Sequence, residues 1–484
     1  MDASERRLGE LLTSACLRHP DDTAIAGTRR SLTYAQLLEE ARAIESGLTH
    51  AGIAVDEPVC VLVSNEPGDI AALLAVWRSG AVAVPLHRTT PPELAASIRE
   101  RTGARFVIDS LADQPVGCAG PPPAPRPLLA DAALIVFTSG STGPPKGVVV
   151  GHRQLADKID AIDSLLAFRP DDRTLLVLNL TFSFGMWVCL LTLLRGGTLV
   201  VRDRFERDGF LGVLAEQRIS RVALVPTMMR LLLAGERATP GAATTPHLRS
   251  VLIGGEQLGV TLAAEIRALF ESATLVDIYG LTETTTCDFF AFPAQAAAHP
   301  GCIGAPSPGV TFRIAHADQD GVGELQLRSP YLMHGYLDAP ETTAAAYDDG
   351  WFRTGDLAVA LPDGLVELRG RLKDVINRGG NKVTPAEVEL ALGRHPDVAA
   401  ALVAGVPDPV IGERIHALVV PRGARTIDET ALRAHLTRYL ERFKHPDVIE
   451  VVAELPLGRT GKSDRGALRA TARSPRTTTE RRDT

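Results

Sequence analysis

The sequence predicts an α/β fold: a large N-terminal domain, in which helices cover parallel-rich sheets, and a small α+β domain at the C-terminal end. Segments typical of strands alternate with segments typical of helices over most of the chain. The length of 484 residues exceeds that of one ordinary domain. A compact unit of different character begins after the 351–371 region, and we therefore expect a domain boundary there.

The N-terminal elements follow one another in a regular order. Thr33 and Gln36 have the spacing of a capping box, and apolar residues follow them at helical intervals up to Leu48. Two strand–helix–strand units are then expected, at residues 59–63, 69–78 and 81–84, and at residues 251–253, 261–270 and 275–278. This alternation predicts parallel strands joined by helices.

The C-terminal unit carries its own helix-start signal. Thr384, Pro385 and Glu387 fit the N-cap, the first and the third position of a helix. A strand is expected near 398–404 and a second helix at 429–443. Residues 471–484 are polar and poor in apolar side chains, so we expect them to be disordered.

Composition and charge argue against several classes of protein. The net charge of −7 and the pI near 6.0, without a basic stripe, argue against nucleic-acid binding. The six cysteines stand singly, which is typical of reduced thiols. The first residues lack the apolar core of a signal peptide, and the apolar run 186–194 is too short to span a membrane. We therefore expect a cytoplasmic protein that binds no membrane.

The most informative segment is Phe137–Gly147, which lies between expected strands at 132–136 and 148–150. Glycines let backbone N–H groups approach an anion, hydroxyls add donors, and a lysine adds positive charge. The candidate phosphate-binding residues are Thr138, Ser139, Gly140, Ser141, Thr142 and Lys146. The segment is not a Walker A loop, because Gly147 follows Lys146 where that motif needs Ser or Thr. A flexible surface turn is the alternative.

This segment resembles the phosphate-binding signature of the adenylate-forming superfamily, which contains acyl- and aryl-CoA ligases, adenylation domains of nonribosomal peptide synthetases, and luciferases. Five further segments between Gly254 and Lys462 resemble the motifs of that family in the same order. The resemblance implies ATP and Mg²⁺ as cofactors. It also implies a large adenylating domain at 1–370, a hinge at 371–373 and a small mobile domain at 374–470, before the tail at 471–484.

The resemblance gives roles to residues after the expected strand at 275–278. Tyr279 would lie against the adenine, Thr282 on the phosphate and Glu283 at Mg²⁺, which takes oxygen ligands shared with ATP phosphates. Ligands of open α/β sheets gather at the carboxyl ends of strands, so these side chains are expected to face a crevice. Without the resemblance, this segment could be a polar loop with Glu283 in solvent.

Three more segments carry nucleotide contacts by resemblance. The adenine-side loop of the family resembles Gly254, Gly255 and Glu256, which alone would read as an ordinary turn. Asp356 resembles the acceptor of the two ribose hydroxyls, since a carboxylate has two oxygens to offer. Arg371 resembles the second ribose contact, and Lys373 falls on the hinge position of the family.

Lys462, within the segment 458–464, resembles the lysine that the family uses for adenylation. Attack of a carboxylate on the α-phosphate accumulates negative charge, which a cation offsets most strongly in the transition state. A lone lysine in a glycine-rich loop would otherwise be solvated. We expect structural roles for His152 and Arg153, which follow the phosphate loop.

The expected substrate pocket is apolar. Amino-acid-activating relatives carry an aspartate near Gly185, and the stretch 179–198 contains no carboxylate to pair with an ammonium group. Gly185 and Gly254 are expected to leave room for a ring, and Asp277 or Asp288 could still reach the pocket. The candidate pocket residues are Phe184, Gly185, Met186, Trp187, Met228, Gly254 and Gly280.

The resemblance therefore implies ATP-dependent activation of an aryl or medium-size aliphatic carboxylic acid, not an α-amino acid, with release of pyrophosphate. The acyl group would pass to a thiol, either CoA or the phosphopantetheine of an acyl-carrier protein. The alternatives are transfer to a nitrogen nucleophile and a nucleotide-binding protein without catalysis. We expect a monomer or a homodimer with a role in secondary metabolism.

Overall fold

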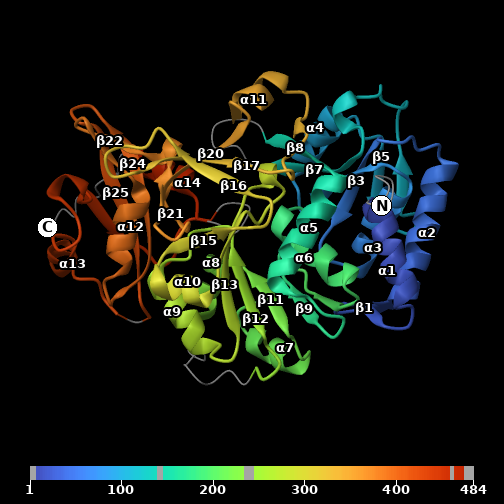
Figure 1. Ribbon diagram of the computed structural model, residues 1–484, viewed down its shortest axis with the longest axis horizontal. Coiled ribbons are helices and arrows are strands. Elements are labelled where there is room, and N and C mark those ends of the chain that lie inside the picture. Colours follow the sequence, from blue (N-terminus) through green and yellow to red (C-terminus); the bar gives the residue numbers. More distant parts are fainter. Residues whose placement is uncertain (1–6, 139–144, 234–244, 424, 458–462, 474–484) are drawn as a thin grey trace, which may run out of the picture.

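Figure 1 shows the computed structural model of the chain, which describes residues 7–138, 145–233, 245–423, 425–457 and 463–473. The large N-terminal part carries two sheets with helices on their faces. The small C-terminal part, coloured orange to red, stands at the left end of the view. The predicted fold class, a large α/β domain followed by a small α+β domain, is confirmed.

The first sheet runs, within the described residues, in the order β18-β8-β7-β4-β3-β5-β6. Its strands are β3 (Pro58–Val63), β4 (Val82–His87), β5 (Phe106–Asp109), β6 (Val116–Cys118), β7 (Ala132–Thr138), β8 (Lys146–Gly151) and β18 (Gly335–Tyr336). The accompanying helices are α1 (Leu8–Arg18), α2 (Tyr34–His50), α3 (Pro67–Arg78) and α4 (Pro92–Thr102), with a 3-10 turn at Pro127–Leu129. β3 pairs in parallel with β4 through α3, as the sequence pattern predicts.

Local signals in the sequence set the start of α2 and the burial of α3. The Thr33 hydroxyl accepts a bond from the Gln36 N–H, and the Gln36 side chain accepts one from the Thr33 N–H, so the predicted capping box is confirmed. α3 is buried along Pro67–Trp77 and packs against α1 and α2 as well as the sheet. Its apolar character on all sides suits a helix inside the protein.

The second sheet is longer and mixed. Within the described residues its order is β16-β17-β20-β21-β15-β14-β13-β12-β11-β9-β10-β1-β2, with β19 beside β20. The parallel part contains β1 (Thr23–Ala26), β9 (Arg173–Leu176), β10 (Thr198–Val201), β11 (Arg221–Leu224), β12 (Ser250–Gly254) and β13 (Thr274–Tyr279), with β2 (Ser31–Thr33) antiparallel at its edge. The antiparallel part contains β14 (Phe289–Ala291), β15 (Cys302–Pro306), β16 (Thr311–Ala315), β17 (Gly323–Arg328), β19 (Tyr347–Asp348), β20 (Trp351–Ala360) and β21 (Val366–Arg371).

Seven helices of this region are described. They are α5 (His152–Leu166), α6 (Ser183–Leu194), α7 (Phe210–Glu216), α8 (Pro226–Leu233), α9 (Val260–Leu269), α10 (Pro293–Ala298) and α11 (Pro340–Ala345), with a 3-10 turn at Thr282–Thr284. The parallel direction changes to antiparallel at β13, where the chain turns back through the 3-10 turn into β14. This reversal places polar side chains at the carboxyl end of β13.

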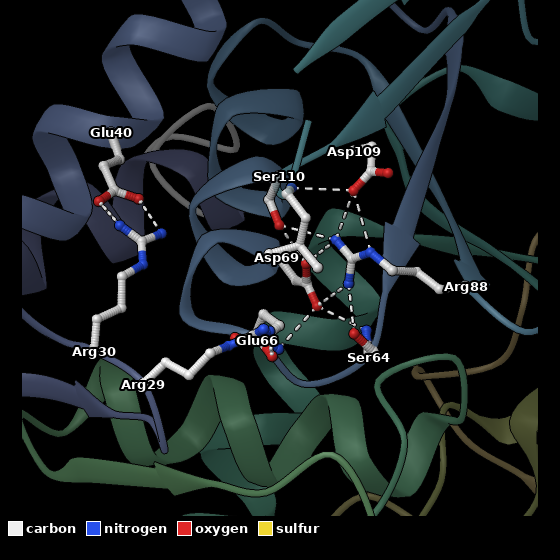
Figure 2. A network of polar contacts seen from close by, with 10 residues as sticks. Arg29, Arg30, Glu40, Ser64, Glu66, Asp69, Arg88, Asp109 and Ser110 are labelled. Carbon is white, nitrogen blue, oxygen red and sulfur yellow. Dashed lines mark hydrogen bonds and ion pairs between the residues drawn. The ribbon is translucent and has the colours of Figure 1, made fainter. Parts of the chain in front are cut away.

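A polar cluster binds the loops at the carboxyl ends of β3, β4 and β5 together, as Figure 2 shows. Arg88, after β4, lies between the carboxylates of Asp69 (Nη2 to Oδ1, 2.6 Å) and Asp109 (Nη2 to Oδ1, 3.0 Å). It also donates to the hydroxyls of Ser64 at 2.6 Å and Ser110 at 2.9 Å. Each of these five side chains has a partner within the cluster, so the cluster stabilises the loops, and we assign it a structural role.

The two sheets of the large domain are joined near this cluster. Asn65 is buried with a left-handed backbone (φ 61°), and its side-chain amide donates to the carbonyls of Leu178 at 3.0 Å and Arg202 at 2.9 Å. The carbonyls belong to loops after β9 and β10 of the second sheet. Asn65 thereby fixes the position of the chain that leads into α6.

The small domain has a sheet in the order β23-β22-β25-β24 within the described residues, with β26 on β25. Its elements are β22 (Ile376–Arg378), β23 (Asn381–Val383), α12 (Pro385–Gly393), β24 (Val398–Asp408), β25 (Gly412–Pro421), α13 (Glu429–Leu436), β26 (Val448–Val451) and α14 (Arg465–Arg473), with 3-10 turns at Leu372–Asp374 and Arg442–Lys444. Its apolar core is separate from the cores of the large domain. The Thr384 start signal is confirmed, since Glu387 accepts the Thr384 N–H at 2.7 Å.

Two details differ from the sequence prediction. The helix expected at 429–443 ends at Leu436, because the N–H groups of Arg438 and Tyr439 bond to the carbonyls three residues before them, at 3.1 Å and 3.0 Å, so the chain continues as turns. Residues 471–473, within the stretch expected to be disordered, belong to α14, and residues 474–484 lie outside the described residues. None of the helices in the described part of the chain is long and apolar enough for a membrane span.

Candidate active site

The predicted phosphate loop connects two antiparallel strands, β7 and β8. β7 and β8 pair in register up to Thr138 and Lys146, which stand opposite each other at the two ends of the loop. Ser139, Gly140, Ser141 and Thr142 lie outside the described residues. The structure therefore fixes the two ends of the predicted phosphate loop.

Lys146 faces the metal-ligand candidate through an intervening tyrosine. The Lys146 Nζ lies 4.8 Å from the centre of the Tyr336 ring, and the Tyr336 hydroxyl donates to Glu283 Oε1 at 3.0 Å. Burial is the main cause that raises the pKa of Tyr336, and the neighbouring Glu283 carboxylate raises it further. The phenol therefore stays protonated and donates. The sequence analysis missed Tyr336, which reaches this place only because β18 pairs with β8.

Thr282 and Glu283 stand in the 3-10 turn that follows β13. Thr282 Oγ1 lies 3.3 Å from Ser183 Oγ at the start of α6, and the Glu283 carbonyl accepts the Met333 N–H at 2.9 Å. Both side chains are half-buried, so neither is free in solvent as the polar-loop alternative required. Thr282 and Glu283 therefore stand at the carboxyl end of β13, and Tyr336 links Glu283 to Lys146.

Three residues predicted separately for the adenosine meet in one contact. The Tyr279 hydroxyl donates to Asp356 Oδ2 at 2.7 Å, and Arg371 Nε lies 2.8 Å from Asp356 Oδ1. Asp356 and Arg371 are partners across β20 and β21, which explains how residues so far from Tyr279 reach it. Burial raises the pKa of Asp356, and the Arg371 charge opposes this shift. This arrangement presents a carboxylate, a phenol and a guanidinium to one ligand face.

The adenine-side segment is tied to α8. Gly255 has a positive φ of 90°, which a side chain would resist, and Gly254 ends β12. Glu256 accepts a hydrogen bond from Thr227 Oγ1 at 2.8 Å, and its Oε2 lies 3.2 Å from Arg230 Nη1. The Glu256 side chain is thus held toward α8, so the backbone of this segment is the part that lies next to β13.

The candidate acid pocket residues lie mainly on α6. The Phe184 and Trp187 rings are stacked with centres 5.6 Å apart, and Met186 and Trp187 are buried. Met228 packs from α8 against the cores on both faces of the second sheet. These side chains form an apolar cluster around the start of α6, where Ser183 contacts Thr282, and their role as the wall of an acid pocket stays a prediction.

The glycines of this wall do not leave the expected room. A Cβ on Gly185 would lie 2.6 Å from the Asn179 carbonyl oxygen, and one on Gly254 would lie 2.7 Å from the Ile278 carbonyl oxygen. A Cβ on Gly280 would lie 2.1 Å from the Cys287 nitrogen. The expectation that Gly185 and Gly254 make space for a ring is therefore wrong, because backbone fills both places. These glycines allow close approach of backbone.

The two acids that could have reached the pocket are engaged elsewhere. Asp288 pairs with the buried Lys158 at 3.2 Å. Asp277 lines a cavity of about 180 Å³ between α9 and α10, together with Arg267 and Cys302, and none of the α6 pocket residues lines this cavity. Burial raises the pKa of Asp277 to about 7. Neither Asp277 nor Asp288 is therefore available to an ammonium group beside α6.

The predicted hinge residue lies in a short turn between the two domains. Lys373 is exposed in the 3-10 turn Leu372–Asp374, and Asp374 Oδ1 lies 3.5 Å from Arg469 Nη2 of α14. Lys462 lies outside the described residues. A bridge between Leu457 and Ser463 closes the base of the segment that contains it.

Comparisons with known proteins match both domains of the chain. The family model of the AMP-binding enzymes matches residues 12–337, and that of their C-terminal domain matches residues 387–462. A feruloyl-CoA synthase of Amycolatopsis is 34% identical over 93% of this chain and 96% of its own length. An indoleacetate–CoA ligase of Aromatoleum aromaticum is 32% identical over 92% of this chain and 94% of its own length.

A solved structure, the amide bond synthetase of Marinactinospora thermotolerans, is 28% identical with a TM-score of 0.80 and covers 96% of this chain and 99% of that one. Both family models and the curated relatives thus extend over the large and the small domain. The chain therefore belongs to the AMP-binding enzymes of the adenylate-forming superfamily and is an AMP-forming acid–thiol ligase.

Proposed function

We propose that this enzyme converts an aryl carboxylic acid to its acyl-adenylate with ATP and transfers the acyl group to the thiol of CoA or of a phosphopantetheine. The observation that carries the proposal is the meeting of two groups at the carboxyl end of β13. One group consists of Tyr279, Asp356 and Arg371, and the other contains Glu283 and Lys146. The first suits a ribose and its base, and the second suits phosphates.

Each group has a chemical task in the first half-reaction. Asp356 accepts hydrogen bonds from the two ribose hydroxyls, and Tyr279 offers its ring to the adenine. Thr282 donates to a phosphate oxygen, while Lys146 adds positive charge at the end of the phosphate loop. The substrate carboxylate attacks the α-phosphorus, the bond to the bridging oxygen breaks, and pyrophosphate leaves. Lys462 offsets the negative charge that accumulates during this attack.

The residues present fit a magnesium ion. Glu283 offers one carboxylate that a hydrogen bond from Tyr336 keeps oriented, and three-carboxylate or histidine clusters are absent from the residues that the structure describes. Mg²⁺ in nucleotide sites is commonly held by one or two carboxylates, phosphate oxygens and water. The ion would neutralise phosphate charge there, with Glu283 as its protein ligand.

An apolar wall without a free carboxylate supports an aryl acid. The stacked Phe184 and Trp187 rings, with Met186 and Met228, favour a flat apolar group at roughly 25 cal/mol per Å² buried. The two relatives named above are a feruloyl-CoA synthase and an indoleacetate–CoA ligase, and both acyl groups carry an aromatic ring. A medium-size aliphatic acid is the second choice.

The acceptor has one competing candidate. The likeness to an amide bond synthetase favours transfer to a nitrogen nucleophile, in which an amine attacks the carbonyl carbon of the adenylate and AMP leaves. In the thiol reaction a thiolate makes the same attack and the same group leaves. The adenylation step is common to both.

One panel experiment tests the whole proposal. Exchange of labelled pyrophosphate into ATP is measured with benzoates, cinnamates, indole acids, fatty acids and α-amino acids. Product formation is then compared with CoA, with a phosphopantetheine-bearing carrier protein, and with an amine. We expect the fastest exchange with an aryl acid and product with a thiol. Faster exchange with any α-amino acid would overturn the substrate class, and product with the amine alone would overturn the acceptor.

A further inference from the structure

A lysine is completely buried behind the nucleotide segment. Lys158 on α5 and Asp288 both have side chains with 0% exposure, and their Nζ and Oδ1 atoms lie 3.2 Å apart. The Lys158 ammonium also donates to Ser307 Oγ at 3.0 Å and lies 5.0 Å from the centre of the Tyr331 ring. An ammonium group removed from water needs such partners, and here it has an anion, a hydroxyl and an aromatic face.

Asp288 ends the segment that carries Thr282 and Glu283. Its N–H donates to the Tyr279 carbonyl at 2.7 Å, so residues 279 and 288 close the segment into a loop. Its second carboxylate oxygen accepts the hydroxyl of Thr284, the residue directly after Glu283. The Lys158–Asp288 pair is therefore linked through one side chain to the backbone next to the metal-ligand candidate.

The backbone of this loop is strained. Thr285, Thr286 and Cys287 have φ values of 57°, 69° and 54°, so three successive residues with side chains adopt the left-handed conformation. L-residues rarely adopt this conformation even singly, because Cβ approaches the following carbonyl oxygen. A segment of this kind keeps its shape only where surrounding contacts impose it.

The contacts that impose the shape lead back to the lysine. Thr285 Oγ1 donates to the Tyr331 carbonyl at 2.5 Å, and Tyr331 is the residue whose ring lies under the Lys158 ammonium. Ser307, the other partner of Lys158, donates its N–H to the Asp288 carbonyl at 2.7 Å. Lys158 thus touches each of the three residues that hold the end of the loop.

We propose that Lys158 is a positioning residue for ATP: its buried pair with Asp288 holds the strained loop 279–288 in the shape that presents Thr282 and Glu283 to the phosphates and Mg²⁺. This inference rests on the proposed function of that loop. It gives a role to a buried lysine that makes no contact with the nucleotide site itself. The competing view is that the pair only stabilises the fold.

A pair of substitutions separates the two views. Lys158→Met alone leaves a buried carboxylate without its cation, and we expect it to lower the melting temperature. Lys158→Met combined with Asp288→Asn removes both charges, and most of the melting temperature should return. If the pair only stabilises the fold, the double variant should recover its use of ATP together with its melting temperature.

The readout is the KM for ATP against that for the acid, measured by pyrophosphate exchange, with Mg²⁺–ATP binding followed by calorimetry. For the double variant we expect an ATP KM roughly 10-fold higher, with the acid KM and the rate at saturating ATP within about threefold of the parent. Lys158→Arg, which keeps the charge, should fall between the parent and the double variant. Ser307→Ala removes one neutral partner and should raise the ATP KM slightly.

A second buried pair provides the control. Arg105 and Glu57 lie 2.7 Å apart with side-chain exposures of 9% and 1%, at the β5 end of the first sheet. Arg105→Met combined with Glu57→Gln should leave the ATP KM unchanged. An ATP KM of the Lys158→Met, Asp288→Asn variant within about twofold of the parent would overturn the inference. A parent enzyme that neither exchanges pyrophosphate nor binds Mg²⁺–ATP would overturn the proposed function itself.

Discussion

The two regions that contribute to the proposed nucleotide site are held in different ways. In the loop 279–288, Thr284 and Asp288 are buried, and the backbone is held in a strained shape by hydrogen bonds and a buried ion pair. At the domain boundary, Arg371 and Lys373 are exposed, while Asp356, the partner of Arg371, and Asp374 are buried. The comparison teaches that strain and burial occur where ligand groups are fixed, and exposure occurs where the chain is expected to move.

Contacts across the boundary support this difference. Outside the boundary segment, α9 of the large domain makes two polar contacts with the small domain. Thr261 Oγ1 donates to the Gly393 carbonyl at 3.2 Å, and Glu265 pairs with Arg422. The apolar core of the small domain is separate from that of the large domain. Polar contacts of this kind exchange with water at low cost, so they suit a domain that rotates.

The largest effect is expected from the small domain. Lys462→Ala should slow adenylate formation by about 10²–10³ or more, because it removes a charge that stabilises the transition state of phosphoryl attack. Thioester formation from a supplied acyl-adenylate should be affected far less. Single-turnover assays of the two half-reactions measure this split.

Lys444→Ala is a matched control for this variant. Lys444 is also on the small domain, but it pairs with Glu387 at 2.8 Å within that domain. It should leave both half-reactions unchanged. If Lys462→Ala slowed both half-reactions equally, the assignment of Lys462 to the first half-reaction would be wrong. The small domain would then have no separate role in that step.

A smaller effect is expected at the boundary. Lys373→Pro fixes φ at a position where a rotating domain must change its backbone angles. We expect roughly 10-fold slower thiol transfer with adenylation within about twofold of the parent. Stopped-flow measurement of each half-reaction checks this.

Lys373→Ala removes the same side chain without fixing φ, and should behave like the parent. If the alanine and proline variants slow thiol transfer equally, the side chain and not the backbone is responsible. The boundary would then lose its role as the flexible member of the comparison.

The smallest effect is expected at Asp277 on β13, the strand that leads into the loop 279–288. The pKa of Asp277 is about 7 in the folded protein, against 3.8 as its ordinary value, so the folded state binds this proton more tightly than the unfolded state. Its contribution to stability is therefore present below pH 4 and is lost as the pH rises toward 7. Asp277→Asn should remove this loss and stabilise the protein at pH 8 by about 1 kcal/mol, less than the full shift because the carboxyl faces a cavity.

Melting temperatures of the parent and the Asn variant at pH 5 and pH 8 test this sign. The difference between the two proteins should be larger at pH 8 than at pH 5, which separates Asp277 from other titrating groups. An equal difference at both values would show that the carboxyl is not held protonated by its surroundings.

Local signals in the sequence predicted much of the fold. The capping residues Thr33 and Thr384 start helices as expected, and β3, α3 and β4 lie close to their predicted ranges. These features depend on neighbouring residues, whose side chains either satisfy the free N–H groups of a helix or form short apolar runs. The helix at 429–443 was predicted too long, because apolar spacing does not register that the backbone bonds of Arg438 and Tyr439 form turns after Leu436.

By itself, the sequence determined the adenylate-forming family, the order of its motifs and the residue types available to the nucleotide: Tyr279, Thr282, Glu283, Asp356 and Arg371. Only the tertiary structure decided that Tyr336 stands between Lys146 and Glu283, that backbone fills the space beside Gly185, and that Lys158 meets Asp288 across 130 residues. The physical reason is that hydrogen bonds and burial between distant strands and helices depend on how the chain packs. Periodicity and capping depend on residues close in the sequence, so they do not predict contacts between residues that are distant in the sequence.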